Sequence, residues 1–252
     1  MIHVFTENFT DTQVRITGDD YNHLKNVLRI QPGDDVFVSD GTGRDVIATV
    51  CDICDGEIVA DIIREHAGNV ELPCEIVLYQ ALPKADKMEY IIQKCVELGA
   101  ARIVPVETSR CIVKLDDKNK VKKVERWQKI ASGASEQSQR SRIPEISSVM
   151  SWKEAVQDAQ KLSRRVIPYE HKNGAGELRK LLRDAAELDI GNIGIFIGPE
   201  GGFTEKEIEE AAAAGIEPVT LGHRILRTET AGMALVAALM LETECGMQKG
   251  DR

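Results

Sequence analysis

The chain has 252 residues, of which 42% are hydrophobic and 29% are charged, and its formal net charge at pH 7 is −9. These values are typical of a globular protein with one large or two smaller domains. No apolar run reaches the ~20 residues that a bilayer-spanning helix needs. The N-terminus lacks a basic region followed by an apolar core, so we expect no secretion signal, no membrane partner and a cytoplasmic location.

The first 70 residues carry strand and turn signals. Residues 36–39 and 45–50 are β-rich and flank the turn 40–43, and residues 57–63 alternate in the same way. A short helix is expected over residues 21–29, ended by Pro32 and Gly33. This pattern predicts a small β-barrel domain over residues 1–70.

Strands alternate with helices after the linker at residues 68–73, which predicts an α/β domain over residues 74–252 with a largely parallel sheet. The expected strands cover residues 74–80, 102–106, 165–170, 194–197 and 217–221. The expected helices cover residues 84–98, 121–139, 175–187, a segment from the capping box Thr204–Glu207 to Gly215, and 230–243.

The six cysteines give no metal signature. Cys51 and Cys54 form a lone C-x-x-C inside a strand-like segment, with no second pair and no histidines at ligand spacing. We therefore predict reduced structural thiols and no bound metal.

Charge is distributed unevenly along the chain. Residues 84–165 hold 18 Lys and Arg against 11 Asp and Glu, whereas residues 1–70 hold 5 against 13. A basic region in an acidic protein is either an electrostatic footprint for phosphate or a lysine-rich solvated surface. Charge alone does not choose between the two.

Two loops near the C-terminus are the most informative stretches. The loop 197–203 contains Gly198, Gly201 and Gly202, and the second loop covers residues 221–231. Each follows a buried strand, and in open α/β sheets ligands bind beyond the carboxyl ends of the strands. Glycine lets the backbone approach a ligand closely, so we predict one pocket for a small planar ligand. G-x-G-x-x-G, P-loop, G-x-S-x-G and H-E-x-x-H motifs are all missing, which disfavours a dinucleotide, a nucleoside triphosphate and covalent or metal-dependent hydrolysis.

Arginines accompany these loops. Arg227 precedes the last helix and is expected to contact the ligand, whereas Arg224 is equally suited to an ion pair with Glu229 or Glu200. Gln137, Arg140 and Arg142 suit either a sugar–phosphate backbone or a surface between subunits.

These motifs, with residues 23–29, 87–99 and 136–146, closely resemble the ribosomal RNA small subunit methyltransferase E family of the SPOUT methyltransferases. The resemblance implies an N-terminal PUA-like β-barrel that binds RNA. It also implies a C-terminal SPOUT α/β domain with a trefoil knot, which binds the cofactor and dimerises into a homodimer. Family members often carry an arginine near the third position, where this chain has His3.

The resemblance also assigns residues. It implies that S-adenosylmethionine (SAM) is held by Pro168, Tyr169, Glu170, Ile197, Gly198, Glu200, Gly201, Gly202, Leu221, Gly222, Ile225, Leu226, Arg227 and Thr230. It implies that RNA is held by His23, Lys25, Arg29, Lys84, Lys87, Arg126, Arg140 and Arg142.

The activity that the resemblance implies is methylation of N3 of one uridine in 16S ribosomal RNA, in an assembled or nearly assembled small subunit. Uridine N3 bears a proton, so the reaction needs a base or a group that stabilises the uridine anion. We expect Arg227 to stabilise that charge, and Glu200 and Glu229 are both candidate bases. The alternatives are a catalytically silent RNA-binding assembly factor on the same scaffold and a phosphate-binding metabolic enzyme.

Overall fold

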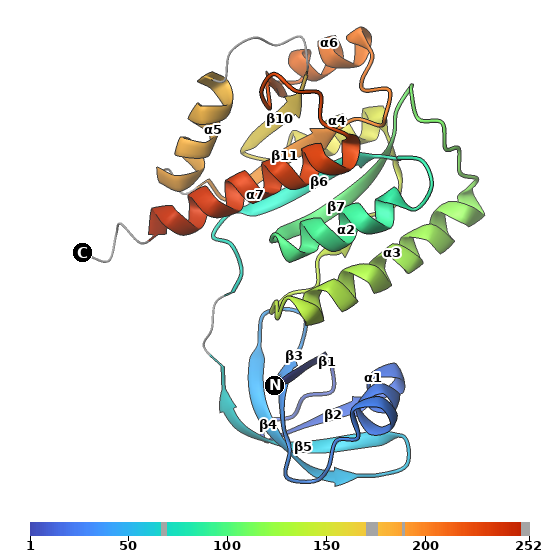
Figure 1. The fold of residues 1–252 in the computed structure, drawn as a ribbon, viewed down its shortest axis with the longest axis vertical. Helices are drawn as coiled ribbons and strands as arrows, with labels where there is room; N and C mark the ends of the chain where they lie inside the picture. Colours follow the sequence, from blue (N-terminus) through green and yellow to red (C-terminus); the bar gives the residue numbers. More distant parts are fainter. Residues whose placement is uncertain (67–69, 170–175, 188–189, 248–252) are drawn as a thin grey trace. The chain divides into compact units, whose positions relative to one another are not determined.

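The computed structural model describes residues 1–66, 70–169, 176–187 and 190–247 (Figure 1). Two compact units make up the fold. The first is Met1–Glu71 with Ser135–Ile143, and the second is Leu72–Ala134 with Pro144–Arg252. The second unit starts at Leu72, and residues 135–143 belong with the first unit.

The first unit is a curled five-stranded sheet in the order β1-β3-β4-β5-β2. Its strands are β1 (Ile2–Phe5), β2 (Gln13–Thr17), β3 (Asp35–Ser39), β4 (Asp45–Ile53) and β5 (Glu57–Glu65). Only the β1–β3 pairing is parallel, and the β4–β5 register shifts twice, which bends the strands. Helix α1 (Gly18–Asn22) continues into the π-turn η1 (His23–Leu28), where a helix was predicted.

A buried polar network explains why residues 135–143 belong to this unit. The Ser39 hydroxyl donates to Asp45 Oδ1 at 2.6 Å, and the Ser141 hydroxyl bonds the other oxygen of Asp45. His3 Nε2 lies 2.8 Å from Ser39 Oγ, and burial lowers the pKa of this histidine. His3 is therefore an interior residue of the barrel-like unit.

The second unit contains a sheet in which every pairing is parallel, as predicted. Its strands run in the order β12-β10-β11-β6-β7-β8, with β9 also pairing with β7. They are β6 (Glu75–Ala81), β7 (Ala100–Glu107), β8 (Glu145–Ile146), β9 (Met150–Ser151), β10 (Arg164–Pro168), β11 (Asn192–Ile197) and β12 (Glu217–Val219).

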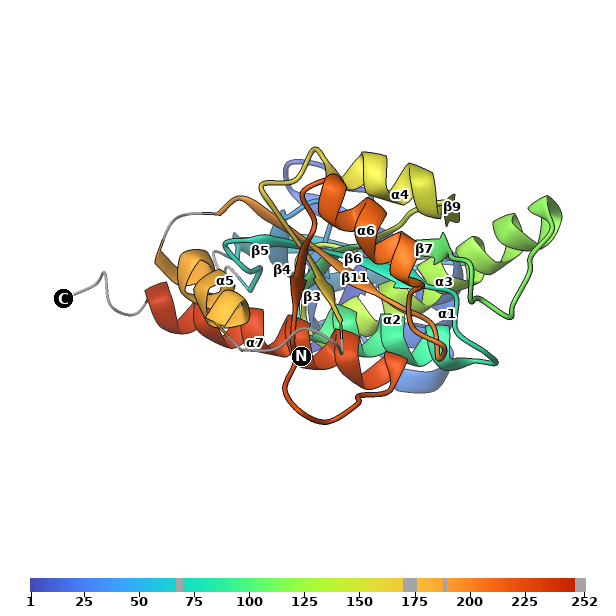
Figure 2. The same cartoon turned by 90° about the horizontal axis from the view of Figure 1, so that it is seen from above.

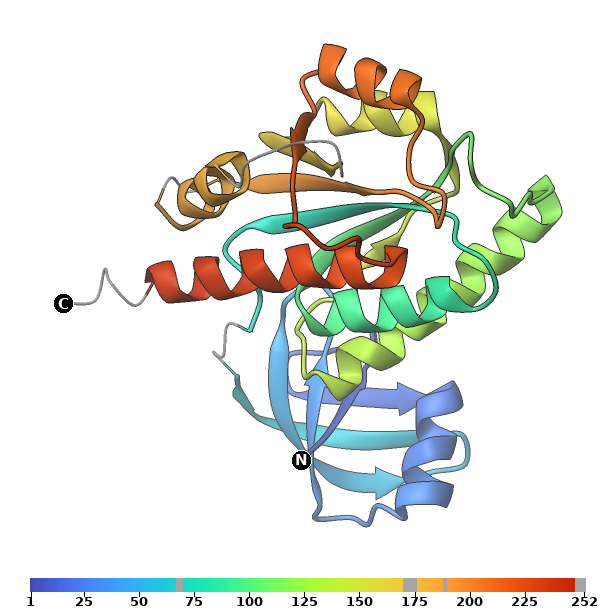
Figure 3. The same cartoon turned by 45° about the horizontal axis from the view of Figure 1, so that its top comes forward.

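Helices cover both faces of this sheet (Figure 2). One face packs against α2 (Lys87–Glu97), α3 (Asp117–Gln137), α5 (Gly176–Glu187) and α7 (Thr228–Met247). The opposite face packs against α4 (Trp152–Ala159) and α6 (Glu205–Ala213). Helix α7 contacts both α2 and α5 (Figure 3), which explains why its sequence is apolar nearly all round.

Three elements of the second unit were not predicted. The short strands β8 and β9 and the helix α4 occupy residues 145–159, where periodicity is weak because two strands have only two residues each. Helix α4 does begin with a capping box, formed by Ser151 and Glu154. In residues 1–66, 70–169, 176–187 and 190–247, no helix is long and apolar enough to cross a bilayer.

Candidate active site

The two predicted loops line a single cleft of about 890 Å³ at the carboxyl ends of β10, β11 and β12. This volume lies within the range of small-molecule sites, about 300–1,000 Å³. The walls come from segments 168–169, 197–203 and 220–228, together with Lys87, Arg110 and Ala231. Parallel strands bring these distant segments to the same edge of the sheet.

Most residues predicted to hold the cofactor line this cleft. They are Pro168, Tyr169, Ile197, Gly198, Glu200, Gly201, Gly202, Leu221, Gly222, Ile225, Leu226 and Arg227. Thr230 does not line it, since it is exposed in the first turn of α7 and its backbone N–H bonds Arg227 O at 2.9 Å. Glu170 lies outside the described residues.

The glycine loop folds back on itself. Gly202 has φ +65°, and its N–H donates to Pro199 O at 2.9 Å. A Cβ at Gly198 would lie 3.2 Å from the backbone of Gly202. Because such contacts are tighter than a side chain normally tolerates, the loop needs glycine at position 198.

Thr228 ties the start of α7 to this loop. Its buried hydroxyl donates to Gly198 O at 2.7 Å and accepts from Gln80 Nε2 at 2.9 Å. Gln80 lies near the end of β6, so Thr228 joins two strand ends and a helix through one side chain. One side chain at the first residue of α7 therefore fixes the position of the cleft wall.

Lys87 lies between two acidic side chains at the edge of the cleft. Its Nζ is 2.9 Å from Glu200 Oε1 and 3.4 Å from Glu229 Oε2. The pKa of Lys87 is raised, chiefly by the bond to Glu200. Lys87 therefore lines the cleft and neutralises two carboxylates there. To hold RNA as predicted, its ammonium group would have to leave these carboxylates.

These contacts bear on the two candidate bases. Burial would raise the pKa of Glu200, but the bonds from Lys87 and from backbone N–H groups outweigh it and lower the pKa below its ordinary value. A carboxylate with a lowered pKa is a weaker base. Glu229 is 19% exposed, is only 3.4 Å from the ammonium, and has an Oε2 with no hydrogen bond among the described residues. Pairing with Lys87 disfavours Glu200 as a base, but Glu200 lines the cleft and Glu229 is not among the described residues that line it, so both stay candidate bases.

The arginines of the second loop are exposed at the cleft. Both Arg224 and Arg227 line it, and Ile225 between them is 84% exposed. The ion pair considered for Arg224 is not formed among the described residues, because Glu200 and Glu229 meet Lys87 instead.

The residues predicted to hold RNA fall into different environments. His23, Lys25 and Arg29 are exposed on and just after η1, and Arg142 is exposed in the first unit. In the second unit Lys84 is exposed, and Arg126 is exposed but paired with Glu89 at 2.8 Å.

Arg140 requires a correction. It is 5% exposed, and its Nη2 lies 2.5 Å from Glu71 Oε2. A buried guanidinium in an ion pair does not present its donors to RNA phosphates. The charge of Arg140 anchors residues 135–143 within the first unit.

Sequence reasoning missed Arg110, which lines the cleft from the turn after β7. Its position at the carboxyl end of a parallel strand was the available signal, since that is where ligands of such sheets bind. Thr228 was missed because a threonine at the start of a helix does not by itself indicate a site.

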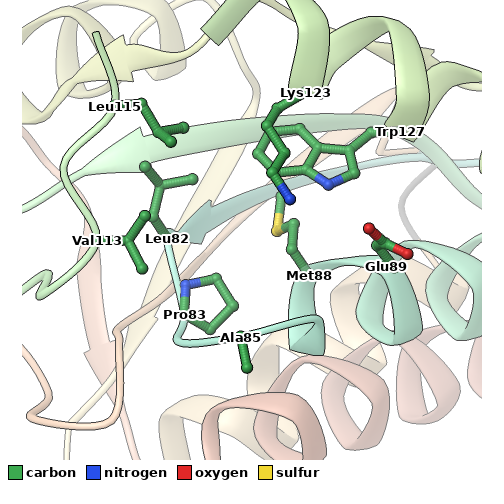
Figure 4. A pocket seen from close by; sticks show the side chains of 9 residues that line it. All are labelled: Leu82, Pro83, Ala85, Met88, Glu89, Val113, Leu115, Lys123 and Trp127. Atoms are coloured by element: carbon green, nitrogen blue, oxygen red, sulfur yellow. The ribbon is translucent and has the colours of Figure 1, made fainter. Parts of the chain in front are cut away.

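A second and much smaller cavity, about 40 Å³, lies between the start of α2 and helix α3 (Figure 4). Its walls include Leu82, Val113 and Leu115, and Met88 and Lys123 lie beside the indole of Trp127. Trp127 is 3% exposed and packs in the core. In the described parts of the chain, no group of three or more His, Cys, Asp or Glu is placed to hold a metal ion.

Comparison with known proteins identifies the two units. Residues 70–240 match the family model of an RNA methyltransferase domain, and residues 16–63 match that of an RNA methyltransferase PUA domain. The chain is 37% identical to the ribosomal RNA small subunit methyltransferase E of Bacillus subtilis over 94% of its own length and 92% of the relative. It is 33% identical to the Synechocystis protein of the same name, over 94% and 75% of the two lengths.

Solved structures agree over nearly the whole fold. A ribosomal RNA small subunit methyltransferase E from Neisseria gonorrhoeae, bound to SAM, superposes with a TM-score of 0.81 at 33% identity and covers 95% of this chain and 96% of its own. A Legionella pneumophila structure with bound SAM reaches a TM-score of 0.84 at 29% identity, covering 95% and 97%. The chain therefore belongs to the ribosomal RNA small subunit methyltransferase E family.

Proposed function

We propose that this protein transfers the methyl group of SAM to N3 of a uridine in 16S ribosomal RNA of the small ribosomal subunit. The observation that carries the proposal is the shared cleft of the loops 197–203 and 220–228, in a chain whose relatives are named for this class of reaction. The family resemblance alone identifies the methylated nucleoside as uridine and the reacting atom as N3.

The cleft fits SAM. Gly198, Gly201 and Gly202 leave room for backbone to approach a flat ring, and Ile197, Leu221 and Leu226 supply apolar surface. The cavity is large enough for a nucleoside with its side chain. These residues would hold the cofactor, which would supply a methyl group already activated by its sulfonium.

The residues of this chain would position and polarise the uridine. Loss of the N3 proton leaves negative charge on the uracil ring, and the guanidinium of Arg227 can stabilise that charge. Glu200 and Glu229 are both candidate proton acceptors, because Glu200 lines the cleft whereas Glu229 is held less tightly by Lys87. Catalysis also requires that the cleft hold the reacting nitrogen close to the methyl carbon and in line with the bond that breaks.

Three further features are proposed from the family resemblance: a homodimer, a trefoil knot in the second unit and a cytoplasmic location. Light scattering of the purified protein would test the dimer, and a monomer at micromolar concentration would refute it.

The decisive experiment maps methylation on RNA. Small subunits lacking the modification are incubated with SAM and the protein, and nucleotides of 16S RNA are analysed by mass spectrometry. We expect one 3-methyluridine that is absent without the protein and forms more slowly with Arg227→Ala. No new methyl group on either subunits or free 16S RNA would refute the proposal. SAM binding by calorimetry separates the silent assembly factor, which would bind RNA without binding SAM.

A further inference from the structure

We propose that Arg110 is a positioning residue that fixes the glycine loop 198–203 from outside the two loop motifs. It lies in the turn that follows β7, nearly ninety residues before the loop. The inference rests on the proposed function only in naming SAM as the ligand whose affinity depends on this contact.

The contact is a double hydrogen bond to backbone. Arg110 Nη1 donates to Gly201 O at 2.8 Å and to Phe203 O at 3.0 Å. The arginine stem also lies against the loop, since a Cβ at Gly201 would be 3.4 Å from Arg110 Cβ. One side chain therefore holds two carbonyl groups of the loop.

The same peptide groups are held at their opposite ends. In a trans peptide the C=O and the following N–H point in opposite directions. The N–H paired with the Gly201 carbonyl is that of Gly202, which bonds Pro199 O at 2.9 Å. The N–H paired with the Phe203 carbonyl is that of Thr204, which bonds Glu207 Oε2 at 2.8 Å. Both peptide planes are thus fixed on both sides.

Glu207 closes the ring of contacts. This carboxylate is 3% exposed, and its Oε1 accepts the backbone N–H of Ser109 at 2.8 Å. Burial would raise the pKa of Glu207, but the N–H donors of Ser109 and Thr204 outweigh it, so the pKa is lowered and the group stays charged. Two side chains therefore join the turn after β7 to the glycine loop. The Arg110 guanidinium donates to two carbonyl groups of the loop, and the Glu207 carboxylate accepts from the N–H groups of Ser109 and Thr204.

This arrangement has a consequence for binding. A loop rich in glycine loses more backbone entropy than other loops when it becomes ordered. A loop that is already fixed before the ligand arrives avoids part of that cost on binding. Arg110 thereby raises the affinity for SAM by ordering the cleft wall.

The test compares three variants of the full chain. Arg110→Ala removes both bonds, and Arg110→Lys can restore only part of the fork-like donor geometry. The matched control is Arg165→Ala, because Arg165 also donates to carbonyls of Gly215 and Leu162, in the same unit but not at the cleft. Hydrogen exchange of a peptide covering residues 198–204 is measured without ligand, and SAM affinity by calorimetry.

We expect Arg110→Ala to speed exchange of the Gly202 and Thr204 amides and to raise the Kd for SAM, each about tenfold, with Arg110→Lys intermediate. Arg165→Ala should leave both values unchanged even if it lowers the melting temperature. Unchanged exchange in Arg110→Ala, or equal changes in Arg165→Ala, would overturn the inference. If the wild-type chain does not bind SAM, the proposed function fails, while the exchange result still decides whether Arg110 fixes the loop.

Discussion

Replacing Thr228 by valine isolates one hydroxyl that connects helix α7 to the cleft. Valine keeps the branched shape but loses the donor to Gly198 O and the acceptor for Gln80 Nε2. Gln80 Nε2 keeps a second bond, to Ala81 O at 2.9 Å, whereas the Gly198 carbonyl loses its threonine partner. The main cost therefore falls on the glycine loop.

The magnitude follows from the burial of the site. Thr228 is 6% exposed, and leaving a buried partner unsatisfied costs about 1–3 kcal/mol. A loss of about 2 kcal/mol corresponds to a fall of about 4–8 °C in melting temperature for a chain of this length. Because the lost bond anchors Gly198, the Kd for SAM should rise about threefold to tenfold.

The assays are thermal unfolding without ligand and calorimetry with SAM. Thr243→Val is the matched control, because Thr243 is also buried in α7 but its hydroxyl bonds only the helix's own carbonyls of Leu239 and Met240. The control should leave SAM affinity unchanged. Wild-type affinity in Thr228→Val, or an equal loss in Thr243→Val, would show that this hydroxyl does not position the loop.

Three other predictions concern both units. Burial, with the charge of Asp20, raises the pKa of Glu136 from its ordinary value of 4.5 to about 7. The folded state therefore favours the protonated carboxyl, and its contribution to stability is complete below pH 4.5 and lost as pH rises to about 7. Glu136→Gln should remove this loss of stability. The melting temperature of the variant should therefore rise relative to that of the wild type between pH 4.5 and pH 7.5, and a constant difference would contradict the raised pKa of Glu136. Arg140→Ala should cost about 3–5 kcal/mol in urea unfolding because it leaves a buried carboxylate uncompensated, whereas Arg142→Ala should change stability by less than about 0.5 kcal/mol and weaken RNA binding in a filter assay. A larger loss of stability in Arg142→Ala than in Arg140→Ala would refute the structural role of Arg140. Arg227→Ala should lower the methylation rate at saturating SAM and RNA about 100-fold; an unchanged rate would exclude its catalytic role.

Local patterns in the sequence were sufficient for much of the architecture. Alternation of strands and helices after residue 73 predicts the parallel sheet, because helical connections are how parallel strands are joined. Glycine-rich loops after buried strands predict the cleft, because the carboxyl ends of parallel strands meet at one edge. Short elements such as β8 and β9 escaped prediction because two residues carry no measurable period.

Tertiary structure decided which charged residues are available for function. Arg140 and Arg142 have the same charge and lie two residues apart, yet the first is buried against Glu71 and the second is exposed. Lys87 likewise meets two carboxylates that lie more than a hundred residues away in sequence. A charge pattern reports what a side chain could bind, and the partner it meets is set by packing between distant segments. The sequence by itself therefore determined the family, the parallel sheet and the loops of the cleft, while the folded chain determined the role of each ionised group, because desolvation and ion pairing depend on distances that exist only after folding.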